Sequence, residues 1–398
     1  MRISTSMIYD RGVGAIQNQW KNILQTQQQV ATGRRVLTPA DDPIASARSL
    51  EIGQTKAVNS QFSVNIGYAD DAMKLLESRL QSAGDILHYV RERAVQAGNG
   101  AMASEDLRYM ATDMKAQFEA MLALANSQDG TGDYIFGGYR AQQQPYDGGL
   151  SGVSYNGDQG ERTIQVSASR YMPTSLPGSD VFDRTLTLDT DSIKIYGGLK
   201  NSGTAAPTLT AVASGAVNQA SRYQLRFDAG TGNYNVSRIG QDGIEVPPAT
   251  TLAPPSATID GLTLSLPTTD VVDGDAFEIY VPSTNMLNNM AMFASALEAQ
   301  NGVSGMTGAV AFALETFDAG QENILKTRAQ IGSQLTETEA LASLGSDLDL
   351  QYATTLSGLQ DVDYAEAISR LTQQQTYLQA AQQSFMRVSG LSLFNYLN

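Results

Sequence analysis

Residues 66–97 read IGYADDAMKLLESRLQSAGDILHYVRERAVQA, and this stretch decides the fold. Its apolar side chains recur in alternating steps of three and four residues, at Ile66, Ala69, Met73, Leu76, Leu80, Ala83, Leu87, Val90, Ala94 and Ala97. That spacing places them on one face of a helix, and such a face is buried against other helices. Gly98, Asn99 and Gly100 follow at once and form a strong stop signal. The sequence therefore predicts one long helix within a helical bundle.

Stripes of the same kind appear on both sides of the middle of the chain. Residues 104–125 follow Ser104, the expected N-cap, and carry Leu107, Met110, Met114, Phe118, Met121 and Leu124. After Pro282, two more stripes contain Met286, Met290, Phe293 and Leu297, and then Val310, Leu314, Phe317, Ile324, Ile331 and Leu335. We interpret these stripes as the chain's own core.

The middle of the chain has a different character. Ten of the 12 prolines lie from Pro145 to Pro282, and proline breaks helices. Alternating apolar residues predict strands at 163–167, 223–227, 233–238, 262–266 and 277–281, and the second and third read as a hairpin around a glycine turn. An aromatic strand is expected at 133–139, within a small hairpin near 133–146.

These patterns predict an α+β multidomain fold. A long antiparallel helical bundle or coiled coil is formed by both chain ends, and an all-β domain is inserted in it. The expected domains are 1–45 plus 360–398 for assembly, 46–145 plus 283–359 for the bundle, and 146–282 for the insert.

The two ends carry heptad stripes with few groups to pack against. An isolated two-helix seam is marginal in water, so we expect neighbouring subunits to supply the missing surface and the ends to become ordered on assembly. The expected interface residues are Tyr9, Val13, Ile16, Trp20, Ile23, Val30, Leu371, Leu378, Phe385, Val388, Leu391 and Phe394. Trp20 is equally compatible with an interface anchor and with a core position.

Polar residues interrupt or follow these stripes. Gln27 occupies a seam position, where a polar side chain often fixes register. Arg34 and Arg35 can pair with Asp41 and Asp42 or with acids of a neighbour. We expect these five residues to set register or specificity, because exposed ion pairs contribute only about 0–1 kcal/mol.

Composition argues against most catalytic chemistry. The chain has 398 residues, a net charge of −15, no cysteine and a single histidine, His88. Its acidity disfavours nucleic-acid binding, and the missing cysteines exclude disulfides and thiolate zinc sites. Asp129-Gly-Thr-Gly-Asp133 lacks the ligand pattern of a calcium loop and is interpreted as a turn. We expect no enzyme activity, cofactor, metal or membrane insertion.

Several motifs carry a resemblance to a known family. QVATGRRVLTPADDP at residues 29–43 and TRAQIGSQL at 327–335 resemble the flagellin superfamily. GDYIFGGY at 132–139 and the ending AAQQSFMRVSGLSLFNYL at 380–397 are similar to its hook–filament junction branch. The likeness covers both flanks, about residues 1–145 and 283–398.

The resemblance implies a structural role outside the cell. The implied function is a subunit of the bacterial flagellum, self-assembled by its terminal helices at the junction between hook and filament. Its implied partners are further copies in a ring or helical layer, the hook-side junction protein, flagellin and an export chaperone. The resemblance also implies export of the unfolded chain through the flagellar type III channel. Residues 1–17 agree with this, since they have no continuous apolar core typical of a cleaved signal.

Two alternatives remain open. The chain can be a flagellin that forms the filament itself. It can also be a surface or carbohydrate-binding module that works through the β insert, with Tyr223 and Tyr234 as stacking platforms or simply as sheet residues.

Overall fold

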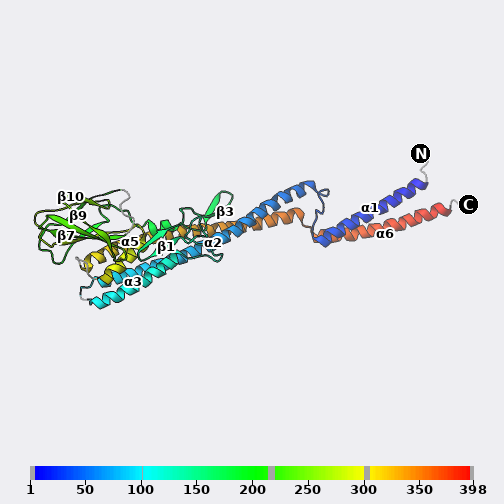
Figure 1. The fold of residues 1–398 in the computed structure, drawn as a ribbon. Coiled ribbons are helices and arrows are strands. Elements are labelled where there is room, and N and C mark those ends of the chain that lie inside the picture. Colours follow the sequence, from blue (N-terminus) through cyan, green and yellow to red (C-terminus); the bar gives the residue numbers. More distant parts are fainter. Residues whose placement is uncertain (1–4, 101, 214–219, 300–304, 395–398) are drawn as a thin grey trace. The chain divides into compact units, whose positions relative to one another are not determined.

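The computed structural model describes residues 5–100, 102–213, 220–299 and 305–394 (Figure 1). Its α-helices are α1 Thr5–Thr32, α2 Pro43–Ala97, α3 Ser104–Ala125, α4 Met286–Ala299, α5 Met306–Gln360 and α6 Tyr364–Phe394. Its strands are β1 Tyr146–Gly149, β2 Gly152–Tyr155, β3 Thr163–Ser167, β4 Arg170–Pro173, β5 Lys194–Gly197, β6 Thr208–Val212, β7 Ser221–Asp228, β8 Asn233–Gly240, β9 Glu245–Leu252, β10 Ser256–Ile259, β11 Leu262–Ser265 and β12 Ala276–Val281. A short π-helix, η1, spans Ser179–Asp183. The expected combination of helical ends and a central strand region is confirmed.

The chain divides into two compact units. The first, here called the terminal unit, comprises Met1–Val64 and Ala342–Asn398. The second, here called the body, comprises Asn65–Leu341. The terminal unit therefore contains the beginning of α2 and the end of α5 in addition to the segments 1–45 and 360–398.

The helices of the body share one hydrophobic core. All ten stripe residues of α2 from Ile66 to Ala97 are buried, as their spacing predicted. Helix α5 runs antiparallel to α2, because Arg328 bonds Glu77 at 2.7 Å and Arg91 pairs with Asp318 much further along α2. Helix α4 is buried on every side from Met286 to Leu297, and its polar Asn288 and Asn289 donate hydrogen bonds to the carbonyls of Val153 and Ser283.

Two helix starts differ from the expectation. Helix α2 begins at Pro43 rather than near Ile66, because proline fits the first turn of a helix, where its missing N–H is not needed. Helix α3 begins at Ser104, so Ala103 is the N-cap and the assignment to Ser104 was wrong by one residue. Ala103 makes no side-chain capping bond, but two acidic residues in the first turn interact favourably with the helix dipole.

The middle of the chain forms an antiparallel double sheet. One sheet has the order β5-β12-β7-β8-β9 and the other β10-β11-β6. The predicted hairpin is confirmed, with Leu225 opposite Val236. The facing sides of both sheets share a core that includes Tyr223, Phe277 and Leu264.

Strand β12 separates this core from the helical one. All six of its residues are buried. Alternate residues such as Phe277 and Ile279 belong to the sheet core, whereas Tyr280 belongs to the helical core and stacks on Phe312 of α5 at 5.7 Å. The two faces of one strand therefore attach the double sheet to the helices.

The small hairpin expected near 133–146 lies elsewhere. Residues 133–139 form turns and isolated bridges, and the hairpin is β1–β2, from Tyr146 to Tyr155. Gly137 and Gly138 interrupt the aromatic run, and Gly138 has φ +68°, which a strand does not accommodate. Ile135 and Phe136 are buried, so the run serves as a packed loop. No helix in the described ranges combines the length and apolarity needed to cross a membrane.

A polar cluster closes the base of the inserted region. Asp183 at the end of η1 accepts hydrogen bonds from Asn285 at 2.7 Å and from the Tyr146 hydroxyl at 3.3 Å. Tyr146 begins the insert and Asn285 lies three residues after its end, so Asp183 links the two connections of the insert to the helices. Burial raises the pKa of Asp183 to about 7.

This carboxyl makes stability depend on pH. Its pKa is higher in the folded than in the unfolded chain, so its contribution is complete below about pH 4 and is lost as pH rises through about 7. We expect Asp183→Asn, which keeps the accepting oxygen, to match the native chain at pH 4. At pH 8 it should be more stable by up to about 4 kcal/mol, because one pKa unit is worth ~1.4 kcal/mol. Chemical unfolding at both values measures this, and equal pH profiles for the two chains would contradict it.

Candidate assembly interface

Helices α1 and α6 of the terminal unit pack against each other along their length. The Tyr9 and Phe385 rings lie 5.1 Å apart, and Gln19 Nε2 donates to the Gln374 carbonyl at 3.1 Å. The partners of successive α1 residues thus come from successively earlier positions of α6. The pair is antiparallel.

Gly12 makes the close approach near the free end of this pair possible. A Cβ at Gly12 would lie 2.7 Å from the Phe385 ring. Phe385 therefore packs directly on the α1 backbone beside Tyr9. The stripe predicted on α1 omits Gly12, since a glycine carries no hydrophobic signal.

The predicted α1 residues divide between two faces. Ile23 faces α6 and is 2% exposed, whereas Trp20 is 48% exposed. Val13, Ile16 and Val30 are half-buried, and Gln27 is exposed. The face against α6 also includes the buried polar residues Thr26 and Gln29, which the pattern of apolar residues did not indicate.

The structure describes the side chains of three of the six predicted α6 residues. Leu378 is buried, and Leu371 and Phe385 are half-buried. The side chains of Val388, Leu391 and Phe394 lie outside the described part of α6. Ala367, absent from the predicted set, is buried on the same face.

The loop between α1 and α2 is tied to the turn between α5 and α6. Val362 N–H donates to the Gly33 carbonyl at 2.9 Å, and Arg35 N–H donates to the Gln360 carbonyl at 2.6 Å. Gly33 has φ +73°, which favours glycine. Arg34 takes part through its backbone, which forms a bridge with Asp361.

The side chains of the same loop complete this clasp. Arg35 pairs with Asp42 at 3.2 Å and donates to the Leu359 carbonyl at 2.9 Å. Asp42 also accepts the Ala45 N–H at 3.0 Å, which caps α2 and holds the pKa of Asp42 below its usual value. Of the two predicted pairings, Arg35 with Asp42 is the one present within the chain.

Asp41 acts as the centre of a turn. Its carboxylate accepts the N–H of Thr38 at 2.8 Å and of Leu37 at 3.2 Å, and Gln25 of α1 donates to it at 2.9 Å. The bond from the Thr38 backbone is the main cause that lowers the pKa of Asp41. The motif at 29–43 therefore fixes how the chain leaves α1 and begins α2.

The terminal unit has very little core. Among its described side chains seven are buried: Ile23, Thr26, Gln29, Ala45, Ser49, Ala367 and Leu378. Three of the seven are polar. Fourteen of its described large hydrophobic side chains are exposed, against ten in the larger body. Large contiguous patches of exposed apolar surface are typical of interaction sites.

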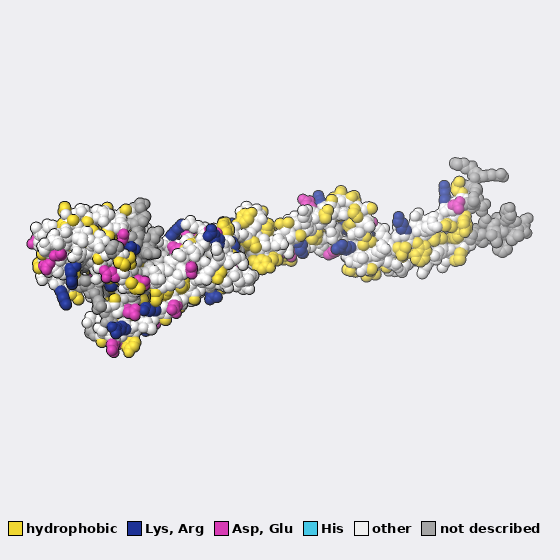
Figure 2. Space-filling model, viewed as in Figure 1, with side chains coloured by type: hydrophobic (Ala, Val, Ile, Leu, Met, Phe, Trp, Pro, Cys, Tyr) yellow, Lys and Arg dark blue, Asp and Glu magenta, His cyan; other side chains and the backbone are white. Residues whose placement is uncertain are grey.

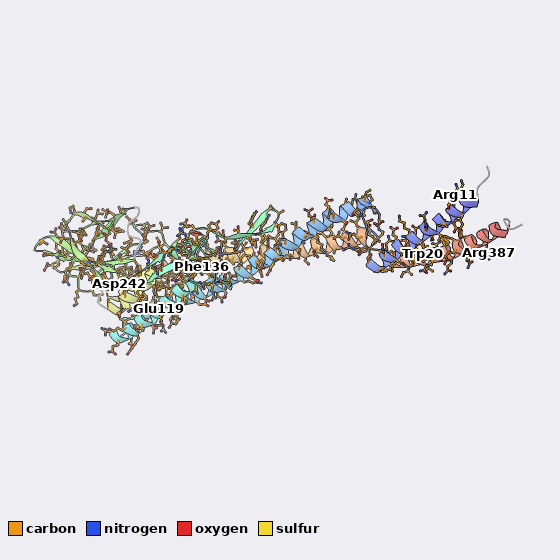
Figure 3. The ribbon with its side chains drawn as sticks, turned by 45° about the vertical axis from the view of Figure 1, so that its right-hand side comes forward. Arg11, Trp20, Glu119, Phe136, Asp242 and Arg387 are labelled. Atoms are coloured by element: carbon orange, nitrogen blue, oxygen red, sulfur yellow. The ribbon has the colours of Figure 1, made fainter. Side chains whose placement is uncertain are left out.

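The exposed side chains on α1 follow one face. Tyr9, Trp20 and Leu24 are separated by eleven and four residues, which brings them to the same side of a helix. Hydrophobic side chains gather along α1 and α6 in Figure 2, and Figure 3 labels Trp20 on α1. The α1–α6 contact therefore leaves a second apolar stripe of α1 open to solvent.

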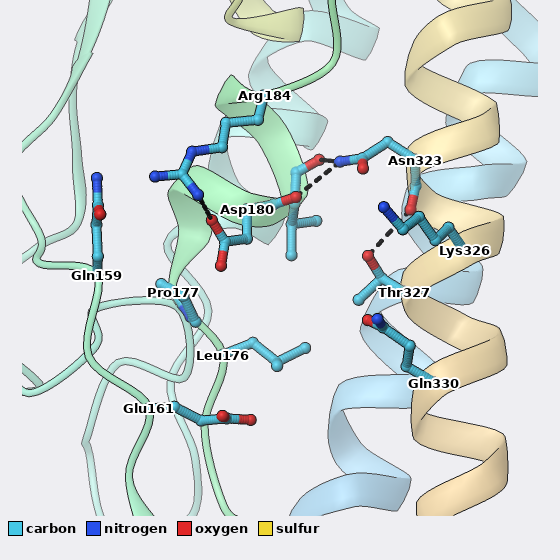
Figure 4. A pocket seen from close by; sticks show the side chains of 11 residues that line it. Gln159, Glu161, Leu176, Pro177, Asp180, Arg184, Asn323, Lys326, Thr327 and Gln330 are labelled. Atoms are coloured by element: carbon cyan, nitrogen blue, oxygen red, sulfur yellow. Dashed lines mark hydrogen bonds and ion pairs between the residues drawn. The ribbon is translucent and has the colours of Figure 1, made fainter.

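The body contains a polar pocket of about 430 Å³ between η1 and α5 (Figure 4). Asp180 and Arg184 form an ion pair at 2.8 Å on one side, and Asn323 of α5 donates to the Asp180 carbonyl at 2.7 Å. Burial and the charge of Asp180 raise the pKa of Glu161 at its edge. Its charges are mixed, and its hydrogen bonds join η1 to α5, so its polar groups already serve the fold.

The other candidate groups have structural roles. Asp129 Oδ1 accepts the N–H groups of Thr131 and Asp133, as in the expected turn. His88 lies 3.0 Å from Gln321 at the surface of the bundle. The described residues contain no group of three or more His, Cys, Asp or Glu able to hold a metal.

The tyrosines of the double sheet are core residues. Tyr223 and Tyr234 are fully buried, and their hydroxyls donate to Asp260 at 2.6 Å and to the Pro267 carbonyl at 2.8 Å. A buried ring presents no face to a sugar, so these two tyrosines are not stacking platforms.

Comparison with known proteins identifies similar chains. A family model for the bacterial flagellin N-terminal helical region matches residues 3–141. Flagellar hook-associated protein 3 of Salmonella typhimurium is 29% identical over 394 residues, or 99% of each chain, and that of Escherichia coli is 28% identical over the same share.

Solved structures show the same fold. FlgL of Xanthomonas campestris is 25% identical with a TM-score of 0.54, over 77% of this chain and 99% of that one. Hook-associated protein 3 of Legionella pneumophila is 25% identical with a TM-score of 0.53, over 77% and 98%. The resemblance to the flagellin superfamily, and within it to hook-associated protein 3, is confirmed. The names of these relatives describe structural parts of the flagellum.

The two faces of α1 should respond differently to truncation. We expect Ile23→Ala to destabilise the α1–α6 pair by about 2 kcal/mol, because it removes buried apolar contacts and leaves a cavity that the two helices can only partly close. Trp20→Ala should change the stability of the free chain by less than about 0.5 kcal/mol, since half of its surface is already in water. Hydrogen exchange of α6 measures both, and equal loss of protection in the two variants would contradict the assignment of faces.

Proposed function

We propose that this chain, which is similar to flagellar hook-associated protein 3 and matches the flagellin N-terminal helical region over residues 3–141, is a structural protein of the flagellum that forms the junction between hook and filament. The observation that carries the proposal is the terminal unit, which exposes fourteen large hydrophobic side chains and buries seven side chains among those described. A unit of this kind gains its missing apolar contacts from other subunits.

In this proposal the chain ends do the assembling. Residues 1–45 and 360–398 act as an antiparallel coiled coil that packs on its neighbours in a ring or helical layer. The first stripe of α1, with Ile23, holds the pair together within a subunit, and the stripe with Trp20 faces the next subunit. Gln27, exposed beside Trp20, fixes register between subunits.

The clasp at Gly33–Asp42 is the rigid connection in this scheme. Arg35 and Asp42 are engaged within the chain, so they define the direction in which α1 leaves α2. Subunits with the same direction can repeat the same contact, which a regular assembly requires. The bundle of residues 46–145 and 283–359 then serves as a scaffold, with 146–282 as an outer insert.

The remaining parts of the proposal extend the resemblance to the flagellin superfamily. The hook-side junction protein and flagellin are the expected neighbours on either side of the layer. An export chaperone and the flagellar type III channel are the expected route out of the cell, with the chain unfolded in transit. A filament-forming flagellin is the alternative function, because the matched family model describes the flagellin N-terminal region itself.

A strain that lacks this gene tests the proposal. We expect hooks without attached filaments, non-motile cells and flagellin released into the medium. Normal filaments on the hooks would contradict a junction function. Purified chain that grows into long filaments alone or from seeds would instead support the flagellin alternative.

The exposed stripe should matter for assembly rather than for folding. We expect the double substitution Trp20→Ala, Leu24→Ala, returned to that strain, to reduce filament attachment at least tenfold. The control is Asn18→Ala, an exposed polar position on another side of α1 that should restore motility. Immunoblots of the medium check that both chains are exported in equal amounts, and full motility of the double variant would contradict the assignment.

A further inference from the structure

An open groove of about 830 Å³ lies beside the beginning of α2 in the terminal unit. Its lining is uncharged and mostly small or apolar, including Pro39, Pro43, Ser46, Ala47, Leu50 and Gly53. Leu50 at its edge is 75% exposed. Continuing along α2, this face includes Ala57 and Val64, and Lys56, which pairs with Asp349, stands at its border. An uncharged surface of this length resembles the core of an interface between proteins, where charged residues are depleted.

The exposed stripe of α1 is complementary to this groove: its side chains protrude where the groove is recessed, and both surfaces are largely apolar. Tyr9, Trp20 and Leu24 are large, apolar and exposed, whereas the groove presents small side chains and a glycine. Large side chains of one helix fit spaces between small side chains of another, and neither surface would bury a charge.

The α1 stripe cannot fill the groove of its own chain. Trp20 lies twelve residues before the end of α1, about 18 Å along the helix axis. The clasp that joins Gly33 to Val362 and Arg35 to Asp42 fixes α1 at that end. Folding Trp20 back onto α2 would break both contacts and the α1–α6 seam, so the occupant comes from another molecule.

We propose that the groove beside α2 receives the Trp20–Leu24 side of α1 from a second copy of this chain. The inference rests on the proposed assembly function and names the surface that receives the stripe. A stripe and a groove at different places on one subunit form a head-to-tail contact, and such contacts build rings or helical rows. Helix α6 also exposes apolar side chains such as Ile368 and Met386, but α1 carries the tryptophan, and tryptophan is enriched among the residues that dominate binding energy at interfaces.

Cysteine cross-linking between two chains tests the contact directly. The chain contains no cysteine, so single substitutions are unambiguous. Chains with Leu24→Cys and with Ala47→Cys carry different tags, are mixed, and are oxidised both as concentrated purified protein and in flagellated cells. We expect dimers that contain both tags. The control mixes Asn18→Cys with Ala47→Cys and should give less than a tenth of that yield, since Asn18 lies on another side of α1.

Filling the groove provides a second arm. A Cβ at Gly53 meets no atom within 4 Å, so Gly53→Leu leaves the free chain folded and removes a helix-destabilising glycine. We expect an unchanged or higher melting temperature together with at least a tenfold loss of cross-linked dimer and of filament attachment. Gly67→Leu is the matched control, because Gly67 also lies on α2 with no atom within 4 Å and outside the groove.

The outcomes separate this inference from the proposed function. Filaments on hooks without a Leu24–Ala47 cross-link would overturn the groove assignment and leave the junction function standing. Absence of the cross-link in both settings overturns it whether or not filaments form. A cross-link from Ile368→Cys of α6 to Ala47→Cys, in place of the one from Leu24→Cys, would overturn the choice of occupant. Gly53→Leu chains that cross-link and attach filaments as Gly67→Leu chains do would also overturn it.

Discussion

A pair of helices can bury only one stripe of each partner, and this limit governs the terminal unit. The contact between α1 and α6 uses the face with Ile23 and Leu378 and leaves Trp20 and Leu24 about half exposed, while Tyr9 contacts Phe385 and is half exposed as well. Hydrophobic burial is the main favourable term in folding, so a two-helix pair is left with little stability of its own. The same shortage becomes a driving force once another subunit covers the exposed stripe. The proposed assembly through the chain ends follows from this constraint.

The body resolves the same problem internally. Helices α2, α3, α4 and α5 share one hydrophobic core. Helix α4 is buried on all sides, and the apolar stripe of α2 is packed in this core along its whole length in the body. Strand β12 shields both cores at once, and the polar cluster of Tyr146, Asp183 and Asn285 closes the insert at its base. Each of these features makes the body independent of a partner. Among the described residues, the two units therefore differ in how much of their apolar surface is buried within the chain.

The sequence predicts those parts of the fold that depend on local periodicity. The ten buried residues of α2 and the β7–β8 hairpin were predictable because spacing alone determines which face is covered. The strand expected at 133–139 was wrong, because two glycines impose turns that the aromatic pattern conceals. The α1 stripe was predicted as one face, and within it the structure buries Ile23 and leaves Trp20 48% exposed. A heptad pattern does not reveal which neighbour covers a residue, and the role of Gly12 beneath Phe385 leaves no hydrophobic signal.

Trp20 is the only tryptophan of the chain, so its fluorescence reports the state of the exposed stripe directly. Emission of the free chain should have its maximum near that of tryptophan in water and should be strongly quenched by iodide. Assembly should shift the emission to shorter wavelength and protect it from iodide by several fold, because the indole enters an apolar interface. Emission that is already shifted and protected in the free chain, and unchanged on assembly, would contradict the claim that this stripe is completed by another subunit.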